Sequence, residues 1–247
     1  MGQEPSHPEL LDWLAKDFRE NNWSIKNLVR KIVLSKTYRQ SSSLNPSCDK
    51  EKVSLSDPQN IFLHKMPVRR LQAEAIRDSI LLFSGRIDKK LFGPSIPIYK
   101  TAFMTGRGGK KNGPLDGAGR RSIYGSVYRN FLSPFMLAFD QPAPFGTKGK
   151  RSVSNVPAQS LALMNDPFVI GQCKMMGKNI FQAKMPKPES VGSLFEMITG
   201  KPPSPKAQEQ LLAFLETQTK AHGSLTEHVW ADLAHVLINS KGFLFLN

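Results

Sequence analysis

The stretch from Met66 to Phe83 reads MPVRRLQAEAIRDSILLF and decides how the rest of the chain is interpreted. It predicts a single helix, because Pro67 suits the first helical position and Gly85 follows where a helix would end. At about 100° per residue, its apolar side chains cover more than half of the circumference, whereas a surface helix is apolar along one stripe. We therefore expect a largely buried helix at the centre of a helical domain.

Charged side chains of this stretch share one narrow stripe of the helical wheel: Arg70, Glu74, Arg77 and Asp78. Arg70 with Glu74, and Glu74 with Arg77, have the spacing at which opposite charges meet on a helix. The stripe has two interpretations, a polar site inside the domain or a buried ion network that only fixes how helices dock. Asp140, farther along the chain, is a further carboxylate that we assign to this buried polar network.

Apolar side chains that recur every three or four residues predict helices on both sides of this stretch. Before it, Leu11, Leu14 and Phe18 share one face, and Ser24 precedes a second amphipathic segment. After it, helices are expected to begin near Ser133–Pro134, Asn155–Pro157, Asp166–Pro167 and Ser204–Pro205, one short helix to end at Gly200, and a last helix to lie within residues 225–240. The sequence therefore predicts an all-α fold.

In other stretches the apolar residues do not recur at a regular spacing. Residues 39–60 are polar and rich in turn-forming residues, which predicts a loop. Residues 85–119 hold eight of the 18 glycines and predict a long irregular segment, of a length that is often functional. Residues 120–128 fit either a helix or a short β element. We divide the chain into a main helical domain, 1–182, and a C-terminal helical lobe packed on it, 183–247.

The chain is strongly basic, with 34 Lys and Arg against 20 Asp and Glu and a formal net charge of +14. Such an excess favours anionic partners, among them nucleic acid, acidic polysaccharide and an anionic membrane surface. The basic residues are scattered, and GRGGKKNG at 106–113 is the nearest approach to a cluster. Nucleic acid is disfavoured, because its binding needs one continuous basic face. No apolar run approaches the length of a transmembrane segment.

Arginines are the best candidates for an anion site, since a guanidinium group grips carboxylate, sulfate or phosphate through two parallel hydrogen bonds. The predicted anion-binding residues are Arg120, Arg121, Arg129 and Arg151. The alternative is that these groups pair with carboxylates such as Glu74, Asp78 and Asp140 inside the fold.

No spacing in the sequence indicates a metal, haem or nucleotide site. Cys48 and Cys173 form no CxxC or CxxCH motif, and both a disulfide and two reduced thiols stay open. His228 and His235 would lie about 10 Å apart along a helix, too far to share one metal ion. No nucleotide-binding glycine motif is complete, and no nucleophile motif assigns a catalytic residue. We predict no metal site and no cofactor in this chain.

Several longer motifs occur in a fixed order: SHPELLDWLAKDF, WSIKNLVRKIVLSKTYRQSS, DPQN, RRLQAEAIRDSIL, RRSIY, FDQP, VPAQSLALMNDPFV and WADLAHVLINSKGFLF. Through them the chain resembles, over nearly its whole length, the C-terminal domain of unknown function of planctomycete-type secreted cytochrome c proteins. Gly242 departs from the family pattern, which has Glu before the Phe, and this puts in doubt any pairing that a carboxylate would make there. The resemblance implies no established activity.

In that family the domain follows a second domain of unknown function, often with a cytochrome c domain ahead of both. The resemblance implies that haem belongs to a separate N-terminal domain and that the N-terminal domains are partners of this chain. It also implies that the chain is a C-terminal part of a longer protein, which is exported to the periplasm or cell envelope.

Two functions from different classes follow. The first is an accessory module that binds an anionic partner, either an acidic or sulfated polysaccharide or a protein, through arginines. The second is a catalytic domain, hydrolytic or redox-associated, with Arg70, Glu74, Arg77 and Asp78 lining a pocket. A catalytic site should lie in a solvent-reached cleft with convergent groups, whereas a structural network should be dry and fully paired.

Overall fold

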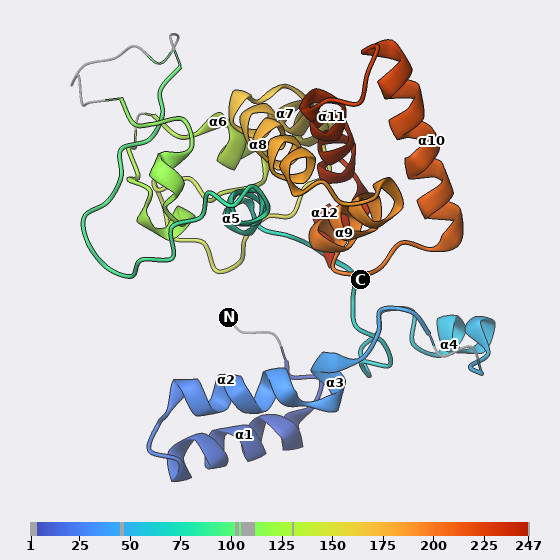
Figure 1. Ribbon diagram of the computed structural model, residues 1–247. Helices are drawn as coiled ribbons and strands as arrows, with labels where there is room; N and C mark the ends of the chain where they lie inside the picture. The colour runs from blue at the N-terminus through green and yellow to red at the C-terminus, as the bar shows by residue number, and fades with distance from the viewer. Residues whose placement is uncertain (1–3, 45–46, 102–103, 105–111, 130, 247) are drawn as a thin grey trace. The chain divides into compact units, whose positions relative to one another are not determined.

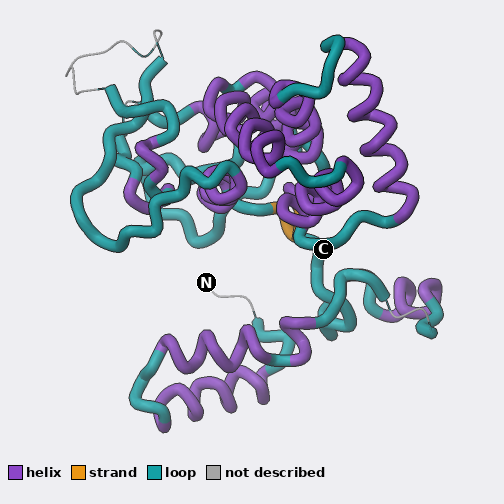
Figure 2. Tube along the Cα trace, in the orientation of Figure 1, coloured by secondary structure: helices purple, strands orange, loops and turns teal. Residues whose placement is uncertain are grey.

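The structure of the protein is a computed structural model that describes residues 4–44, 47–101, 104, 112–129 and 131–246. It is all-α, as predicted: the described residues form twelve α-helices, two 3-10 turns and one small two-stranded sheet (Figures 1 and 2). Most of the basic cluster predicted at 106–113 lies outside the described residues. None of the described helices is long and apolar enough to cross a membrane.

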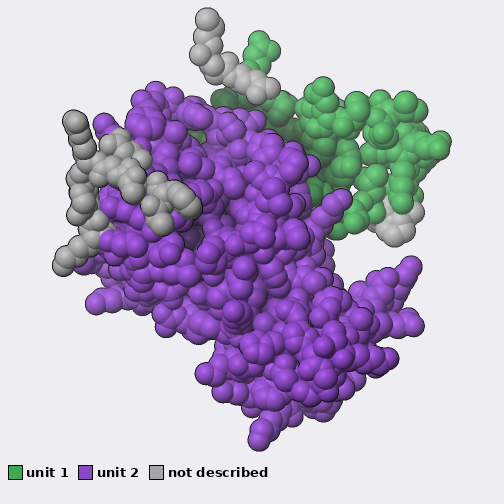
Figure 3. Space-filling view, turned by 90° about the horizontal axis from the view of Figure 1, so that it is seen from above, with its two compact units in different colours: residues 1–69, 247 green, residues 70–246 purple. Residues whose placement is uncertain are grey.

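The chain forms two compact units, which Figure 3 shows in different colours. Unit 1 comprises Met1–Arg69 with Asn247, and unit 2 comprises Arg70–Leu246. The division predicted from the sequence, 1–182 and 183–247, stays a prediction. Its boundary lies within unit 2, at the end of α8 (Pro167–Ala183).

Unit 1 contains a helical hairpin and two short helices, namely α1 (Pro8–Glu20), α2 (Ile25–Leu34), α3 (Lys36–Arg39) and α4 (Lys50–Ser56). The hairpin confirms the two helices predicted there, and Ser24 caps α2 by accepting a hydrogen bond from the Asn27 N–H. An ion pair between Lys31 and Asp17 joins the two helices. The Phe18 ring of α1 also meets the Trp23 ring of the connecting turn edge to face, with 5.3 Å between the ring centroids.

Helix α4 corrects the prediction of an unbroken loop over residues 39–60. Asp49 accepts hydrogen bonds from the N–H groups of Glu51 and Lys52 and so supplies the N-cap of this short helix. The turn-rich composition concealed the cap, because Asp is common both in turns and at helix starts.

Unit 2 is built around α8 and α11 (Glu227–Ile238), which pack along each other (Figure 1). Around α11 lie α9 (Lys187–Thr199), α10 (Pro205–Ala221) and α12 (Lys241–Leu244). On the other side, α5 (Ala73–Phe83), α6 (Pro134–Ala138) and α7 (Pro157–Asn165) pack in succession toward α8. The core takes fully buried side chains from these helices, including Ile76, Ile80, Phe139, Leu163, Val169, Met176, Val191, Leu194, Leu215, Leu233 and Ile238.

Three predicted helix starts in unit 2 are confirmed by their caps. Ser133, Asp166 and Ser204 each accept a backbone N–H at the start of α6, α8 and α10, and each is followed by Pro. Gly200, with φ of 73°, ends α9 in the left-handed conformation that glycine adopts without strain. These local signals are the reason that the helices of this unit could be placed from the sequence.

The central stretch is helical only from Ala73 onward, which corrects the prediction that the helix begins at Pro67. Arg69–Arg70 form strand β1, which pairs with β2 (Phe245–Leu246), and the Leu71 N–H donates to the Leu244 carbonyl oxygen at 2.8 Å. This backbone cannot also make helical hydrogen bonds, so α5 starts later. It ends before Gly85 as predicted, and its Ala73, Ile76, Ile80 and Leu81 are buried.

Residues 85–133 cross unit 2 as an irregular segment in their described part. It contains the 3-10 turns η1 (Gly117–Gly119) and η2 (Ser122–Tyr124). Isolated parallel bridges join Asp88 to Arg120 and Ile96 to Gly125. The 120–128 stretch thus holds a 3-10 turn together with isolated β-bridges.

Both cysteines are free, and they differ in environment. Cys173 is buried in α8, and burial raises the pKa of its thiol to about 12, whereas Cys48 is exposed. Because the thiolate is the reactive form, we expect Ellman's reagent at about pH 8 to label one thiol in the folded protein and the second only after unfolding. In Cys48→Ser the folded protein should stay unlabelled. Rapid labelling of two thiols in the folded wild type would contradict this arrangement.

Candidate functional site

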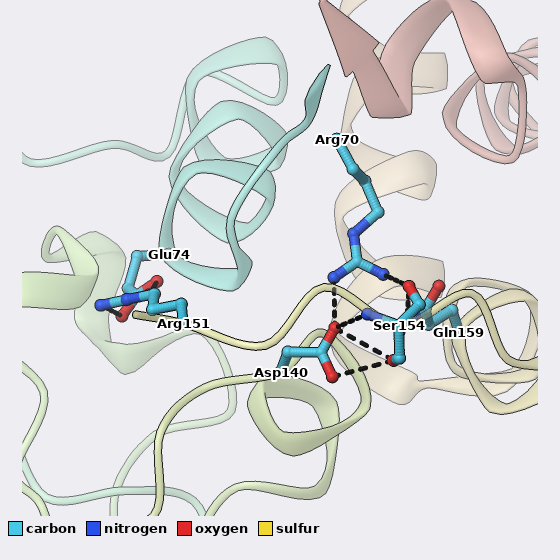
Figure 4. A network of polar contacts seen from close by, with 6 residues as sticks. All are labelled: Arg70, Glu74, Asp140, Arg151, Ser154 and Gln159. Atoms are coloured by element: carbon cyan, nitrogen blue, oxygen red, sulfur yellow. Dashed lines mark hydrogen bonds and ion pairs between the residues drawn. The ribbon is translucent and has the colours of Figure 1, made fainter. Parts of the chain in front are cut away.

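The charged stripe predicted around α5 divides into two networks, of which the first joins Arg70 to Asp140 (Figure 4). The Arg70 side chain is 6% exposed, and it donates to Asp140 Oδ2 and to the Ser154 carbonyl oxygen, each at 2.5 Å. Asp140 also accepts hydrogen bonds from the N–H and the hydroxyl of Ser154, each at 2.8 Å. The contact between Asp140 and Ser154 therefore closes a loop, residues 141–153, at its base.

The rest of this network holds Ser154 and Asp140 in place. Gln159 is buried, and its Nε2 donates to the carbonyl oxygen and the hydroxyl of Ser154 at 3.2 Å. Burial alone would raise the pKa of Asp140, but hydrogen bonds from Ser154 and Arg70, together with the Arg70 charge, outweigh it and lower that pKa below 3.8. The carboxylate is thus held in its charged form.

Glu74 does not pair with Arg70, and this corrects the pairing expected from helical spacing. Arg70 lies on β1, outside α5, while Glu74 forms a two-pronged ion pair with Arg151 at 2.7 and 3.0 Å (Figure 4). The hydrogen bond from Arg151 lowers the pKa of Glu74 against the opposing effect of burial. The Arg151 and Glu74 side chains are 39% and 28% exposed, so this pair lies at the surface.

The second network ties the 3-10 turns to α5. Arg77 donates to the carbonyl oxygens of Asp116 and Arg120 at 2.8 and 3.0 Å and to the Ser122 hydroxyl at 3.1 Å. Asp78 Oδ1 accepts from the N–H and the hydroxyl of Ser122, each at 2.7 Å. Arg77 also lies 3.5 Å from Asp78 on the same helix, but the shorter contacts of both side chains are with the irregular segment, which the charged face of α5 therefore organises.

Arg120 has a structural role among the predicted anion-binding arginines. It is 8% exposed and donates to the carbonyl oxygens of Lys90 and Phe92, and its guanidinium lies 3.9 Å from the centroid of the Tyr124 ring. Its ion-pair partner is Asp88, at 3.5 Å. Both terminal nitrogens of the Arg120 guanidinium therefore have acceptors inside the fold.

The structure brings Arg121 and Arg151 to one face of α5. The Arg121 side chain is 48% exposed and lies 3.8 Å from Asp78, while Arg151 pairs with Glu74. Glu74 and Asp78 are one helical turn apart, which corresponds to about 6 Å along the axis. Arg129 is exposed on the irregular segment. An anionic group at this face would therefore meet two partly exposed guanidinium groups.

Two basic residues that the sequence pattern did not single out lie close to Arg151 in the chain. Lys148 and Lys150 lie exposed in the 141–153 loop, and neither forms an ion pair with another described residue. Lys150 is the chain neighbour of Arg151. The sequence does contain a signal for this basic loop, namely TKGKR at 147–151, in which three basic residues lie next to a glycine. The segment falls between two predicted helices.

No three His, Cys, Asp or Glu side chains in the described part of the chain come close enough together to hold a metal ion. His235 hydrogen-bonds through Nε2 to the Leu163 carbonyl oxygen at 2.9 Å, so it joins α11 to α7. The candidate site is therefore defined by guanidinium, ammonium and carboxylate groups.

These features define a helical domain in which one short helix, α5, fixes an irregular segment and a basic surface loop through ion networks. A family model described as "Protein of unknown function (DUF1553)", PSD1, matches residues 1–215. The chain belongs to this family of proteins of unknown function. No curated protein matches the sequence, and no solved structure matches it.

Proposed function

We propose that this chain is an accessory module of an exported, haem-linked multidomain protein, and that it binds an acidic or sulfated polysaccharide through the 141–153 loop. The observation that supports the binding role is the exposed pair Lys148 and Lys150, on a loop whose base is closed by Asp140 and Ser154. A loop fixed at its base loses less conformational entropy on binding than a free one.

The neighbouring arginines suit a polymer that carries repeated anionic groups. Arg151 and Arg121 are partly neutralised by Glu74 and Asp78, so the uncompensated charge of this face comes from the two lysines. A sulfate group matches the planar fork of a guanidinium, and it would compete with Glu74 for Arg151. Phe145, 68% exposed at the start of the loop, adds an aromatic surface against which a sugar ring can lie.

The wider context of the proposal rests on the resemblance to planctomycete-type secreted cytochrome c proteins. In that context haem is held by a separate N-terminal domain, since Cys48 and Cys173 form no haem-attachment motif. The N-terminal domains are partners of this module, and the full-length protein lies in the periplasm or cell envelope.

The arrangement around α5 supports the structural interpretation of the predicted polar stripe over a catalytic one. Arg70 forms one network with Asp140, while Arg77 and Asp78 belong to another, centred on Ser122. The carboxylates of each network accept hydrogen bonds from within it, whereas Arg70 Nε is buried without a hydrogen-bond partner among the described residues. Glu74 belongs to neither network, because it pairs with Arg151. The residues that were candidates for a catalytic pocket are thus divided among three sets of contacts.

The test measures binding to heparin, neutral dextran and duplex DNA across a salt titration. We expect salt-sensitive binding to heparin, weaker binding to DNA and none to dextran. Lys148→Glu/Lys150→Glu should weaken heparin binding by about tenfold or more, since two attractive contacts become repulsive. The matched control, Lys174→Glu/Lys178→Glu, makes the same charge change on the exposed side of α8 and should have a much smaller effect.

Equal losses in the loop variant and the α8 variant would show generic electrostatics and overturn the proposed loop site. Equal affinity for heparin and DNA would do the same. Absence of heparin binding would remove the polysaccharide role altogether.

A further inference from the structure

The helical hairpin of unit 1 exposes large apolar side chains on both of its helices. No residue of α1 or α2 is buried. On α2, Ile25 is 70%, Val29 50% and Ile32 41% exposed, and on α1 Leu10 and Leu11 are 51% and 53% exposed. Soluble proteins rarely leave contiguous apolar surface of this kind unless it meets another protein or a membrane.

The polar side of the same surface is basic. Residues 25–39, which span α2 and α3, contain five Lys and Arg and no Asp or Glu. Lys31 pairs with Asp17 of α1. The remaining four cations are exposed and form no ion pair with any residue in the described ranges, namely Lys26, Arg30, Lys36 and Arg39. The acidic residues of the hairpin lie on α1, so α2 and α3 present the cationic side.

Tryptophans flank this surface. Trp23, immediately before α2, is 65% exposed, and Trp13 on α1 is 56% exposed, with the Lys31 ammonium 5.9 Å from its ring centroid. Trp is enriched where apolar and aqueous phases meet, because its large ring is apolar and its N–H is polar. A helix with one apolar face, Lys and Arg on the other face and Trp beside it is typical of elements that lie in a membrane interface.

We propose that the hairpin together with α3, residues 8–39, binds the surface of an anionic lipid bilayer. The apolar side chains Ile25, Val29 and Ile32 enter the boundary between headgroups and acyl chains, about 5–10 Å deep. The cations of α2 and α3 pair with lipid phosphates. Charge complementarity selects this occupant, because a stretch with five cations and no acid suits an anionic headgroup layer. This site lies in unit 1 and shares no residue with the polysaccharide site.

The experiment uses the whole chain with vesicles of phosphatidylcholine, alone or mixed with phosphatidylglycerol, and measures co-sedimentation and tryptophan fluorescence. Trp13 and Trp23 are exposed while Trp230 is buried, so a blue shift on binding reports the hairpin. With the phosphatidylglycerol vesicles we expect binding and a blue shift, and both should be lost at high salt. Affinity for phosphatidylcholine alone should be lower by about tenfold or more.

Two variants separate charge from apolar contact. Lys26→Glu/Arg30→Glu should weaken binding by more than about tenfold, because each basic group near an anionic surface contributes on that scale. Lys174→Glu/Lys178→Glu has the same four-residue spacing and charge change on α8 and should bind like wild type. Ile25→Ser changes a side chain that is already 70% exposed, so it should weaken binding without unfolding the hairpin or changing the salt dependence.

Other occupants of this surface give different results, and each would overturn the proposal. A dimer in sedimentation equilibrium, without vesicle binding, would show that a second copy covers the hairpin. A monomer whose Trp13 and Trp23 resist acrylamide quenching would show that the chain itself covers it. Lys148→Glu/Lys150→Glu should retain vesicle binding, which keeps this inference independent of the polysaccharide proposal.

Discussion

Arg70→Met is expected to lower the free energy of unfolding by about 3 kcal/mol, because it leaves the part-buried Asp140 carboxylate without its cation. The Arg70 and Asp140 side chains are only 6% and 16% exposed. Met keeps the length and apolar character of the arginine stem, so the loss reports charge and hydrogen bonding. The Ser154 carbonyl oxygen loses a donor in the same change. Urea unfolding followed by far-UV circular dichroism measures the effect.

The matched control makes the same substitution at the surface pair. Arg151→Met removes the partner of Glu74, where both side chains are partly exposed, and should cost less than about 1 kcal/mol. Similar losses of unfolding free energy in the two variants would show that the burial of the Arg70–Asp140 pair does not determine how much the pair contributes to stability.

Acidification gives a second measurement on the same pair. The pKa of Asp140 lies below its ordinary value of 3.8, so its ionised form contributes stability above that value, and the contribution is lost as pH falls through the lower pKa of the folded state. Removing Arg70 takes away one cause of the lowered pKa. The difference in stability between wild type and Arg70→Met should therefore shrink below about pH 4.

Gly177→Ala is expected to destabilise the protein by about 2–3 kcal/mol, although alanine is the better helix former. A Cβ at Gly177 would lie 2.4 Å from the Glu227 carbonyl oxygen and 2.5 Å from the Ala231 nitrogen. Both are backbone atoms of α11, so the clash can be relieved only by moving α8 away from α11. Thermal or urea unfolding gives the value.

Gly171, on the same helix, is the control for this substitution. A Cβ there meets nothing within 4 Å, and Gly171→Ala should stabilise the protein by about 0.5–1 kcal/mol through helix propensity alone. The two changes are chemically identical and are expected to have opposite signs. A stabilising Gly177→Ala would show that α8 and α11 do not approach each other as closely as the structure indicates.

The helices of unit 2 were predictable where their starts are encoded locally. Ser133, Asp166 and Ser204 can each accept a backbone N–H, and Pro follows each of them in the first turn. The start of α5 was not predictable in this way. Its position depends on the backbone of residues 69–71 pairing with residues 244–246, and a local window contains no sign of that partner.

In the candidate site, too, the sequence indicated which residues take part but not all of the contacts that they make. Arg70, Glu74, Arg77 and Asp78 were recognisable as a set, because a charged stripe on an apolar stretch is visible on a helical wheel. Arg151 was among the arginines that could be expected to pair with Glu74, Asp78 or Asp140, and it does pair with Glu74. The serine partners were not recognisable, since the positions of Ser122 and Ser154 depend on tertiary packing. The spacing rule for ion pairs applies within one helix, and Arg70 lies on a strand.

Because Asp140 and Ser154 are in contact, the stability of the domain depends little on the sequence of the 141–153 loop between them. When a loop is closed at its base by side-chain contacts, its length has little effect on the packing of the core. Doubling the length of a flexible loop costs only about 0.6 kcal/mol in closure entropy. Related chains can therefore diverge between residues 141 and 153 by insertion or replacement while the helices stay fixed. The same property makes this loop a site for inserting an affinity tag or a fluorescent reporter without disturbing the fold.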